Sequence, residues 1–294
     1  MAPIYSPLKS IPNFRDVGVF VNDTASTTQL KTGLLFRGAR PDEASFQERQ
    51  RLLHEYKIKS IIDLRTKTEH VEQAQKRDAK IKASSAVAQS NDEVAEPLKI
   101  PGIVYHEINF NGSAFSRMLI SKLSWIEFFR LVFLMLAGYR LDAIKILAPH
   151  MESSGVTGLA VDSLDVCTRE VKQVFQVLSD QSNWPCLVHC TQGKDRTGLV
   201  VMLVLFLLGV EIDAIEKDYL LSEPELAAER PARIKEIQSI GLSERFAMCP
   251  PDTVSTVHEH IQSKYGSVEA YLGGVGVTRA MMDSLKRILH EDAA

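Results

Sequence analysis

The feature that most constrains this chain is the segment at residues 189–198, which reads His-Cys-Thr-Gln-Gly-Lys-Asp-Arg-Thr-Gly. A short apolar run at 186–188 precedes it, and a longer apolar run at 199–208 follows it. This order predicts a buried strand, a tight glycine-containing loop and a buried helix. The loop is too polar to belong to the core, so its residues are candidates for function.

The predicted loop has the composition of an anion site that also holds a reactive thiol. The first backbone N–H groups of a helix have no partner within the helix, and the helix dipole adds positive charge there. Gly193 lets the backbone fold closely around an oxyanion, and Arg196 can donate two parallel hydrogen bonds to a phosphate. Thiols in such a field ionise readily, and the thiolate is the nucleophilic form. A cysteine on an apolar strand is usually a small core residue, but Cys190 stands at the end of its strand and is therefore a candidate nucleophile.

The spacing His-Cys, five residues, Arg-Thr is the signature of cysteine-dependent phosphatases. The full segment at 189–198 resembles the atypical tyrosine and phosphoinositide phosphatases of the LipA-like, mycobacterial secreted phosphatase B-like and IphP-like group, including its fungal members. Weaker likenesses to the motifs of this family lie at residues 13–18, 35–38, 62–66, 218–220 and 265–272. The resemblance spans nearly the whole chain, and the loop is its most specific part.

The resemblance implies the cysteine phosphatase fold and hydrolysis of phosphotyrosine and phosphoinositide monoesters through a phosphocysteine intermediate. It implies no cofactor and no metal. Composition agrees, because a net charge of −3 gives no general field for nucleic acid. The four cysteines show no CxxC pair or metal-ligand spacing. The first ten residues lack a basic start and an apolar stretch, so we expect no signal peptide and a reducing, cytoplasmic location.

The order of apolar runs predicts one α/β domain over residues 1–294, with a central, mostly parallel sheet of four to five strands and helices on both faces. Strands are expected at 33–36, 60–64, 103–108 and from Cys186, and helices from Asp42, over Thr168–Leu178, and throughout the part after the loop. A mobile loop is expected around 83–99, which is rich in small and polar residues.

A helical insertion is expected around residues 115–150, and its segment at 125–136 is intensely apolar. That segment is too short to span a membrane and contains Glu127 and Arg130. Two interpretations stay open. Its composition is first that of a helix buried in the core, and the alternative is a helical lid over the active site or an interfacial surface that docks on lipid. Helical insertions that cover the pocket at this point in the family support the alternative, and the two interpretations overlap because a lid helix also buries its apolar face.

The resemblance gives each loop residue a role. Cys190 attacks phosphorus, and Arg196 with the loop N–H groups stabilises the transferred phosphoryl group. Thr197 can donate a hydrogen bond to the cysteine sulfur or cap the helix, and His189 orders the loop rather than acting as a base. The other residues expected to contact substrate are Thr191, Gln192, Gly193 and Lys194.

The general acid is harder to assign from the sequence. The Trp-Pro-Asp loop of conventional tyrosine phosphatases is missing, because the Trp184-Pro185 pair leads directly into a strand. The aspartate that the mycobacterial group carries after the third strand is also missing, since residues 109–112 read Asn-Phe-Asn-Gly. Asp195 is therefore the predicted acid. Asp63, at the carboxyl end of a parallel strand, is the reserve.

Lys194 adds a second cation to the loop, which suits a substrate with several negative charges. The family associates this lysine with phosphoinositides; its plainer role is loop solubility. The expected partners are phosphotyrosine proteins, phosphoinositide lipids, or both, with peripheral membrane contact. Two other functions remain open: a catalytically silent module that binds phosphorylated ligands, and a rhodanese-type sulfurtransferase.

Overall fold

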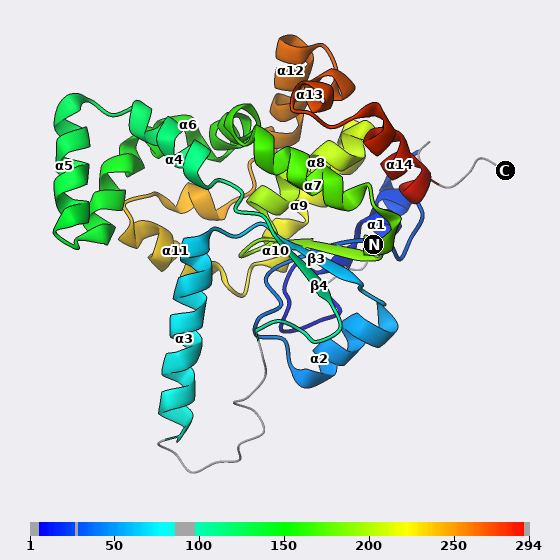
Figure 1. The fold of residues 1–294 in the computed structure, drawn as a ribbon, viewed down its shortest axis with the longest axis horizontal. Helices are drawn as coiled ribbons and strands as arrows, with labels where there is room; N and C mark the ends of the chain where they lie inside the picture. The colour runs from blue at the N-terminus through cyan, green and yellow to red at the C-terminus, as the bar shows by residue number, and fades with distance from the viewer. Residues whose placement is uncertain (1–5, 27–28, 86–97, 291–294) are drawn as a thin grey trace.

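The computed structural model of this chain describes residues 6–26, 29–85 and 98–290. A five-stranded sheet in the order β1-β2-β5-β3-β4 forms its centre (Figure 1). All neighbouring strands run parallel except β1 and β2, which are antiparallel. The strands are β1 (Arg15–Asp16), β2 (Leu35–Gly38), β3 (Ser60–Asp63), β4 (Val104–Glu107) and β5 (Cys186–His189). The predicted α/β class with a mostly parallel sheet is confirmed.

Helices make up most of the remaining described chain. The first half contains α1 (Val17–Thr24), α2 (Phe46–Gln50) continued by η1 (Arg51–Glu55), α3 (Lys67–Ser85), α4 (Ser113–Ser121), α5 (Trp125–Leu136) and α6 (Arg140–Val166). The second half contains α7 (Thr168–Leu178), η2 (Gln181–Asn183), α8 (Asp195–Leu207), α9 (Ile212–Leu220), α10 (Ser222–Glu225), α11 (Arg230–Ser239), η3 (Glu244–Ala247), α12 (Thr253–Tyr265), α13 (Val268–Gly274) and α14 (Arg279–Leu289). The predicted bounds of α7 agree with the structure, and α2 begins four residues later than expected because Ser45, not Asp42, caps it.

Two apolar layers hold the sheet between helices. Alternate residues of a strand point to opposite faces, so Ile62 and Val188 join the larger core with α7, α8 and α12–α14. Ile61 and Leu187 point the other way, into a smaller core beneath α2. Helix α8 is apolar on every side and is buried from Thr197 to Leu207, as expected of a helix at the centre of a domain. Because β2, β5 and β3 are parallel, their carboxyl ends meet at the edge of the sheet where α8 begins.

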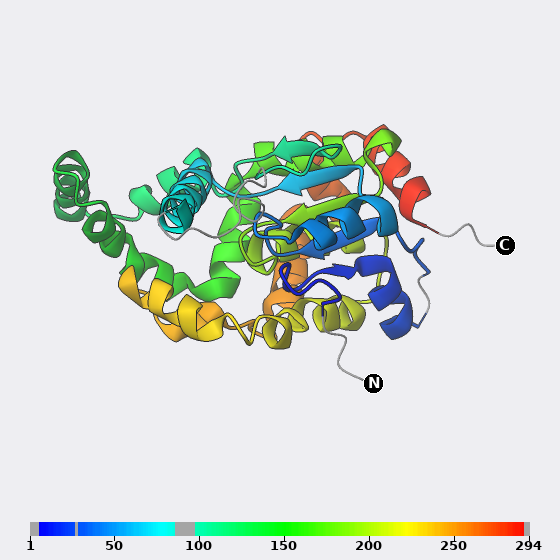
Figure 2. The same cartoon turned by 90° about the horizontal axis from the view of Figure 1, so that it is seen from below.

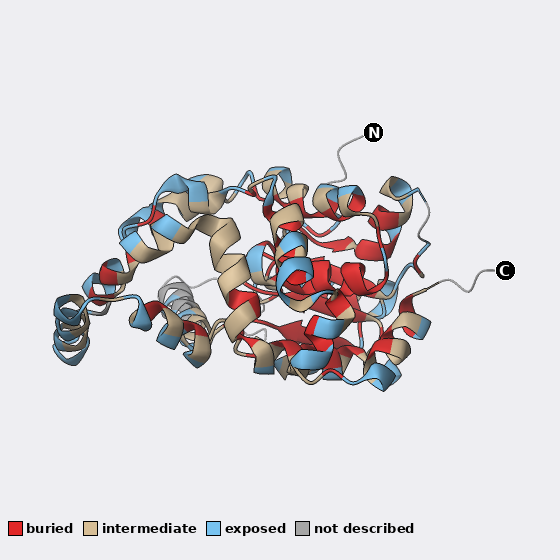
Figure 3. Ribbon diagram, turned by 90° about the horizontal axis from the view of Figure 1, so that it is seen from above, coloured by how far each residue is buried: buried red, intermediate tan, exposed pale blue. Residues whose placement is uncertain are grey.

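The insertion contains α4, α5 and α6, and it extends away from the sheet (Figures 1 and 2). The interpretation of residues 125–136 as a buried core helix is wrong, because no residue of α5 is buried. Trp125 is 78% exposed, Ile126 82% and Phe129 64%. Helix α5 packs against α6 at the far end of the molecule, and no other part of the described chain covers its outer side (Figure 3).

Most of the loop predicted at 83–99 lies outside the described residues. Its first three positions, 83–85, belong to the end of α3. No helix within 6–26, 29–85 and 98–290 is both long enough and apolar enough to cross a membrane.

Candidate active site

The loop between β5 and α8 presents its backbone N–H groups to one side and its carbonyls to the other. No backbone N–H of residues 191–197 donates a hydrogen bond to any residue that the structure describes. The carbonyls of this loop are occupied: Thr191 accepts from the Arg40 N–H (3.3 Å), and Lys194 accepts from the Gly198 N–H (2.8 Å). A row of free donors at the start of a helix is an anion cradle. The structure thus gives the loop the shape that its sequence predicts.

Side chains behind the loop fix this orientation. The Asn13 amide donates to the carbonyls of Gln192 (3.2 Å) and Gly193 (3.0 Å), and Arg37 Nη2 donates to Gly193 (2.8 Å). Arg15 and Arg37 both pair with the buried carboxylate of Asp218. Burial by itself would raise the pKa of Asp218, but the two guanidinium groups lower it, so the carboxylate stays charged.

These supporting residues come from three segments that the sequence marks only through their family likeness. Asn13 and Arg15 lie at or beside β1, Arg37 is in β2, and Asp218 is in α9. What they contact is decided by the sheet order, which brings β1 and β2 next to β5.

Gly193 is required by both conformation and space. Its φ is +67°, in the left-handed region that glycine adopts without strain. A Cβ at this position would lie 2.1 Å from the Gly38 carbonyl oxygen at the end of β2. The loop therefore rests directly on the backbone of the neighbouring strand, which only glycine permits.

Cys190 lies at the end of β5 and is buried, with 3% of its surface exposed. The structure has no disulfide among its four cysteines. Burial raises the pKa of the other three thiols, to about 12 for Cys167 and Cys186 and about 11 for Cys249. They are therefore protonated and poor nucleophiles at neutral pH. Of the four cysteines, Cys190 is the one in the loop between β5 and α8.

The His189 ring lies behind the cysteine. Its Nδ1 is 3.0 Å from the Cys190 carbonyl oxygen, and its Nε2 is 3.5 Å from an Asp63 carboxylate oxygen. Burial lowers the pKa of His189 although Asp63 opposes the shift, so the ring is neutral at pH 7. Nδ1–H then donates to the carbonyl, and the ring fixes the backbone at the nucleophile.

Asp63 does not reach the substrate side of the loop. Its carboxylate pairs with Arg65 at 2.7 Å and is buried. Burial would raise its pKa, but His189 and Arg65 outweigh that effect and hold it well below its usual range. A carboxyl that stays ionised is a poor proton donor at neutral pH. The structure therefore gives Asp63 a supporting position beneath His189 instead of the site of a reserve acid.

Arg196 is held by a residue that sequence reasoning missed. Its Nη1 and Nη2 donate to the two carboxylate oxygens of Glu69, each at 2.7 Å, and Nη1 also donates to the Leu64 carbonyl (3.2 Å). The Thr191 hydroxyl donates to the same carboxylate. Burial alone would raise the pKa of Glu69, but Arg196 lowers it well below its usual range. The available signal was the capping box of Thr66 and Glu69 that begins α3.

The contacts of Arg196 leave one edge of its guanidinium free. A guanidinium has five N–H donors in a fixed plane, and the described contacts use both on Nη1 and one on Nη2. The remaining two, on Nε and Nη2, point in parallel from the adjacent edge. This edge can hold a phosphate in the two-bond geometry that arginine favours, while Glu69 holds the end.

Lys194 has a different environment from the predicted one. Its side chain is fully buried, and its ammonium donates to the carbonyls of Met248 (2.7 Å) and Phe246 (3.1 Å). These carbonyls belong to the segment around η3. The ammonium also lies 3.5 Å from an Asp195 carboxylate oxygen. In this structure Lys194 connects the loop to the chain that follows α11.

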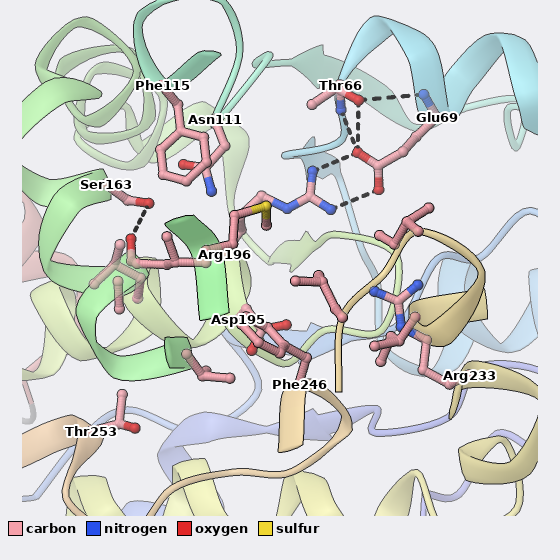
Figure 4. A pocket seen from close by; sticks show the side chains of 18 of the residues that line it. Thr66, Glu69, Asn111, Phe115, Ser163, Asp195, Arg196, Arg233, Phe246 and Thr253 are labelled. Carbon is pink, nitrogen blue, oxygen red and sulfur yellow. Dashed lines mark hydrogen bonds and ion pairs between the residues drawn. The ribbon is translucent and has the colours of Figure 1, made fainter. Parts of the chain in front are cut away.

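Beside the loop lies a cavity of about 460 Å³ (Figure 4). Asp195, Arg196, Glu69 and Thr66 form its polar end, and Asp195 is half exposed there. Its other walls are mainly apolar and come from α4, α6, α8 and the segment around α11 and η3. The Oγ1 of Thr197 is buried and makes no hydrogen bond to any described residue, so the predicted contact with the cysteine sulfur is not formed.

Comparison with known proteins agrees with this geometry. Residues 6–291 match the sequence profile described as the tyrosine phosphatase family. The chain is 31% identical over 121 residues to the triple specificity protein phosphatase PtpB of Mycobacterium tuberculosis, covering 36% of this chain and 44% of that protein. It is 34% identical over 159 residues to a tyrosine-protein phosphatase of Nostoc commune, covering 50% and 52%.

A shorter match, 40% identical over 38 residues, relates the chain to the inositol diphosphatase DSP2 of Arabidopsis thaliana, covering 13% of this chain and 15% of that protein. The matches to PtpB and the Nostoc protein span only about half of those relatives. The family profile, in contrast, runs from before the Asn13 segment to beyond α14. It therefore includes every strand and the anion-binding loop, and the chain belongs to the tyrosine phosphatase family.

Proposed function

We propose that this protein is a phosphatase that hydrolyses phosphate monoesters through a phosphocysteine intermediate on Cys190. The observation that carries the proposal is the row of free N–H donors at 191–197, next to the free edge of Arg196. Phosphoryl transfer depends on positioning and on stabilising the charge of three equatorial oxygens. An N–H cradle and a two-bond arginine supply both.

The reaction has two steps. The Cys190 thiolate attacks phosphorus, the bond from phosphorus to the ester oxygen breaks, and the leaving oxygen takes a proton from a general acid. Water then attacks phosphorus and gives a proton to the carboxylate that the acid has become, the phosphorus–sulfur bond breaks, and inorganic phosphate leaves with the thiolate and the acid restored. Removing one preorganised donor from comparable oxyanion sites costs roughly 10²–10³ in rate.

Asp195 is our proposed general acid. It lines the cavity beside Arg196 and is half exposed, so it can exchange protons with water between turnovers. Glu69 and Asp63 pair with Arg196 and Arg65 at 2.7 Å, whereas Asp195 is half exposed and lies 3.5 Å from its nearest cation, Lys194. The loop would then supply both the nucleophile and the acid.

The proposed substrates are phosphotyrosine and phosphoinositide monoesters. The apolar walls of the cavity suit an aromatic ring, and two relatives are described by their names as a triple specificity phosphatase and an inositol diphosphatase. We also propose that α5 contacts membranes peripherally, since Trp125, Phe129 and Phe133 are exposed on it and aromatic side chains favour the bilayer interface. A cytoplasmic location fits the free thiols.

Hydrolysis of p-nitrophenyl phosphate tests the proposal, with Cys190→Ser and Arg196→Lys as variants. We expect the parent protein to release phosphate and Cys190→Ser to be inactive. The phosphocysteine intermediate on Cys190 should be detectable in the parent protein by rapid acid quench and mass spectrometry. Phosphate release by Cys190→Ser at the parent rate would refute the mechanism. Tight phosphate binding without turnover would identify a silent binding module, and cyanide-dependent turnover of thiosulfate would identify a sulfurtransferase.

A further inference from the structure

A second guanidinium lines the cavity and comes from a helix outside the loop. Arg233, in the first turns of α11, lines the cavity together with Arg196 and Asp195. Figure 4 shows Arg196 and Arg233 approaching the same space from different elements. The family motifs include neither Arg233 nor its helix, and the mechanism above leaves this residue without a role.

The contacts of Arg233 leave much of its hydrogen-bonding capacity unused. Its Nη1 pairs with Glu236 on the same helix at 2.7 Å, and Glu236 is exposed. Its Nε is buried and has no hydrogen-bond partner, and Nη2 makes no hydrogen bond to any described residue. An exposed pair three residues apart on a helix contributes little free energy. Arg233 therefore keeps a positive charge and free donors beside the cavity.

The surroundings of Arg233 make this charge selective. Apolar side chains, including Ile237, Leu242 and Phe246, line the same cavity as Arg233. A substrate that fills the space removes water, and ionic hydrogen bonds gain strength in such an environment. An anion in the cavity loses its hydration, which is unfavourable without a new partner. The Arg233 guanidinium can replace the lost hydrogen bonds to water with charge-assisted ones.

We propose that Arg233 is a specificity-determining residue that binds a second anionic group, a carboxylate or a phosphate, on the leaving-group part of the substrate. The inference rests on the proposed phosphatase function and adds to it the substrate class: monoesters that carry a second negative charge away from the phosphate being removed. The sequence predicted Lys194 as the cation for additional negative charges of the substrate, but the Lys194 ammonium is bound to two backbone carbonyls. Among the described residues that line the cavity, Arg233 is the cation besides Arg196.

Matched pairs of aryl phosphates test this inference. One member of each pair carries a carboxylate on a flexible arm, and the other carries its methyl ester. We expect kcat/KM to favour the acid about tenfold in the parent protein, the value of one additional charge-assisted hydrogen bond. Arg233→Met keeps the length of the side chain and should bring the acid-to-ester ratio close to one.

Arg230→Met is the matched control. Arg230 lies on the same helix and pairs with Glu223 at 3.4 Å, but it does not line the cavity. It should keep the acid-to-ester ratio of the parent protein. An equal ratio for Arg233→Met and the parent would overturn the inference, as would the same loss of ratio in Arg230→Met. Absence of any turnover by the parent protein would instead reject the proposed function.

Two further substrate pairs distinguish the source of the second charge. One is a phosphotyrosine peptide with glutamate or glutamine beside the phosphotyrosine, and the other is a soluble inositol bisphosphate against the monophosphate. Loss of discrimination in Arg233→Met for the peptide pair assigns the second anion to acidic peptides. Loss for the inositol pair assigns it to a second phosphate. Unchanged discrimination in both pairs contradicts the inference.

Discussion

The guanidinium of Arg196 meets the carboxylate of Glu69 end-on, with two N–O distances of 2.7 Å. Glu69 belongs to the first turn of α3, and Arg196 belongs to the first turn of α8. The pair therefore joins two elements that are 127 residues apart in the chain. It fixes the plane of the guanidinium and leaves the Nε and Nη2 edge without a partner among the described residues. The orientation of the Arg196 side chain therefore depends on a residue outside the loop.

Replacing Glu69 by glutamine should lower kcat/KM for p-nitrophenyl phosphate by about 10- to 100-fold. The amide cannot accept from both Nη atoms, and misplacement of a catalytic group by about 1 Å can cost 10²-fold. Glu72→Gln, an exposed change on the same helix, is the control and should keep full activity. Equal activity of the two variants in steady-state assays would show that Arg196 is oriented without Glu69.

Asp195→Asn should lower turnover by about 10²–10⁴ for esters with poor leaving groups and much less for good ones. A leaving oxygen of high pKa needs a proton, whereas one of low pKa leaves as the anion. The measurement is a plot of log kcat against leaving-group pKa for a series of aryl phosphates, which should become steeper in the variant. Equal slopes for Asp195→Asn and the parent protein would mean that Asp195 is not the general acid.

Lys194→Met should destabilise the fold by about 1–3 kcal/mol, because the carbonyls of Phe246 and Met248 lose their buried donor. Urea denaturation measures this loss. The same variant should slow short-chain phosphoinositides and aryl phosphates by similar factors, since the ammonium does not line the cavity. A loss confined to phosphoinositides would restore the substrate contact expected from the sequence.

Asp218→Asn should cost about 3–5 kcal/mol of stability, because it leaves Arg15 and Arg37 buried without their counter-charge. Asp213→Asn changes an exposed carboxylate on the same helix and should stay within about 0.5 kcal/mol of the parent. Chemical denaturation compares the two. A small loss in Asp218→Asn would indicate that the arginines find other partners.

Stability should fall as the pH drops from 7 to 5, and His189 should contribute to the fall. Its folded pKa is lowered, so the unfolded chain binds a proton that the folded chain refuses. The contribution of the neutral His189 to the free energy of unfolding is fully present above the pKa of the unfolded chain, about 6.5. Below that pH it is lost at up to about 1.4 kcal/mol per pH unit. Thermal unfolding at several pH values should show a shallower dependence in His189→Gln. An identical dependence would exclude His189 as the cause.

Local sequence was sufficient to predict the strand, loop and helix at the centre of the site. The apolar runs on each side of residues 189–198 favour a buried strand followed by a buried helix. The polar residues between them can bind an anion through groups that are close together in the sequence. The bounds of β2 and α2 were displaced by two to four residues, since a parallel strand is delimited by its neighbours and a helix by its cap. The parallel sheet followed from alternating strands and helices.

The fold class and the strand, loop and helix that hold Cys190 and Arg196 could be predicted from the sequence alone, because neighbouring residues create these features. Tertiary structure alone decided that Glu69 orients Arg196, that Lys194 turns to the carbonyls beyond α11, and that Asp63 is bound to Arg65. It also decided that α5 stays exposed and that Arg233 faces the cavity. The charge and polarity of a side chain follow directly from its residue type. Its partner depends on which distant segments the sheet order and the helix packing bring within hydrogen-bond distance.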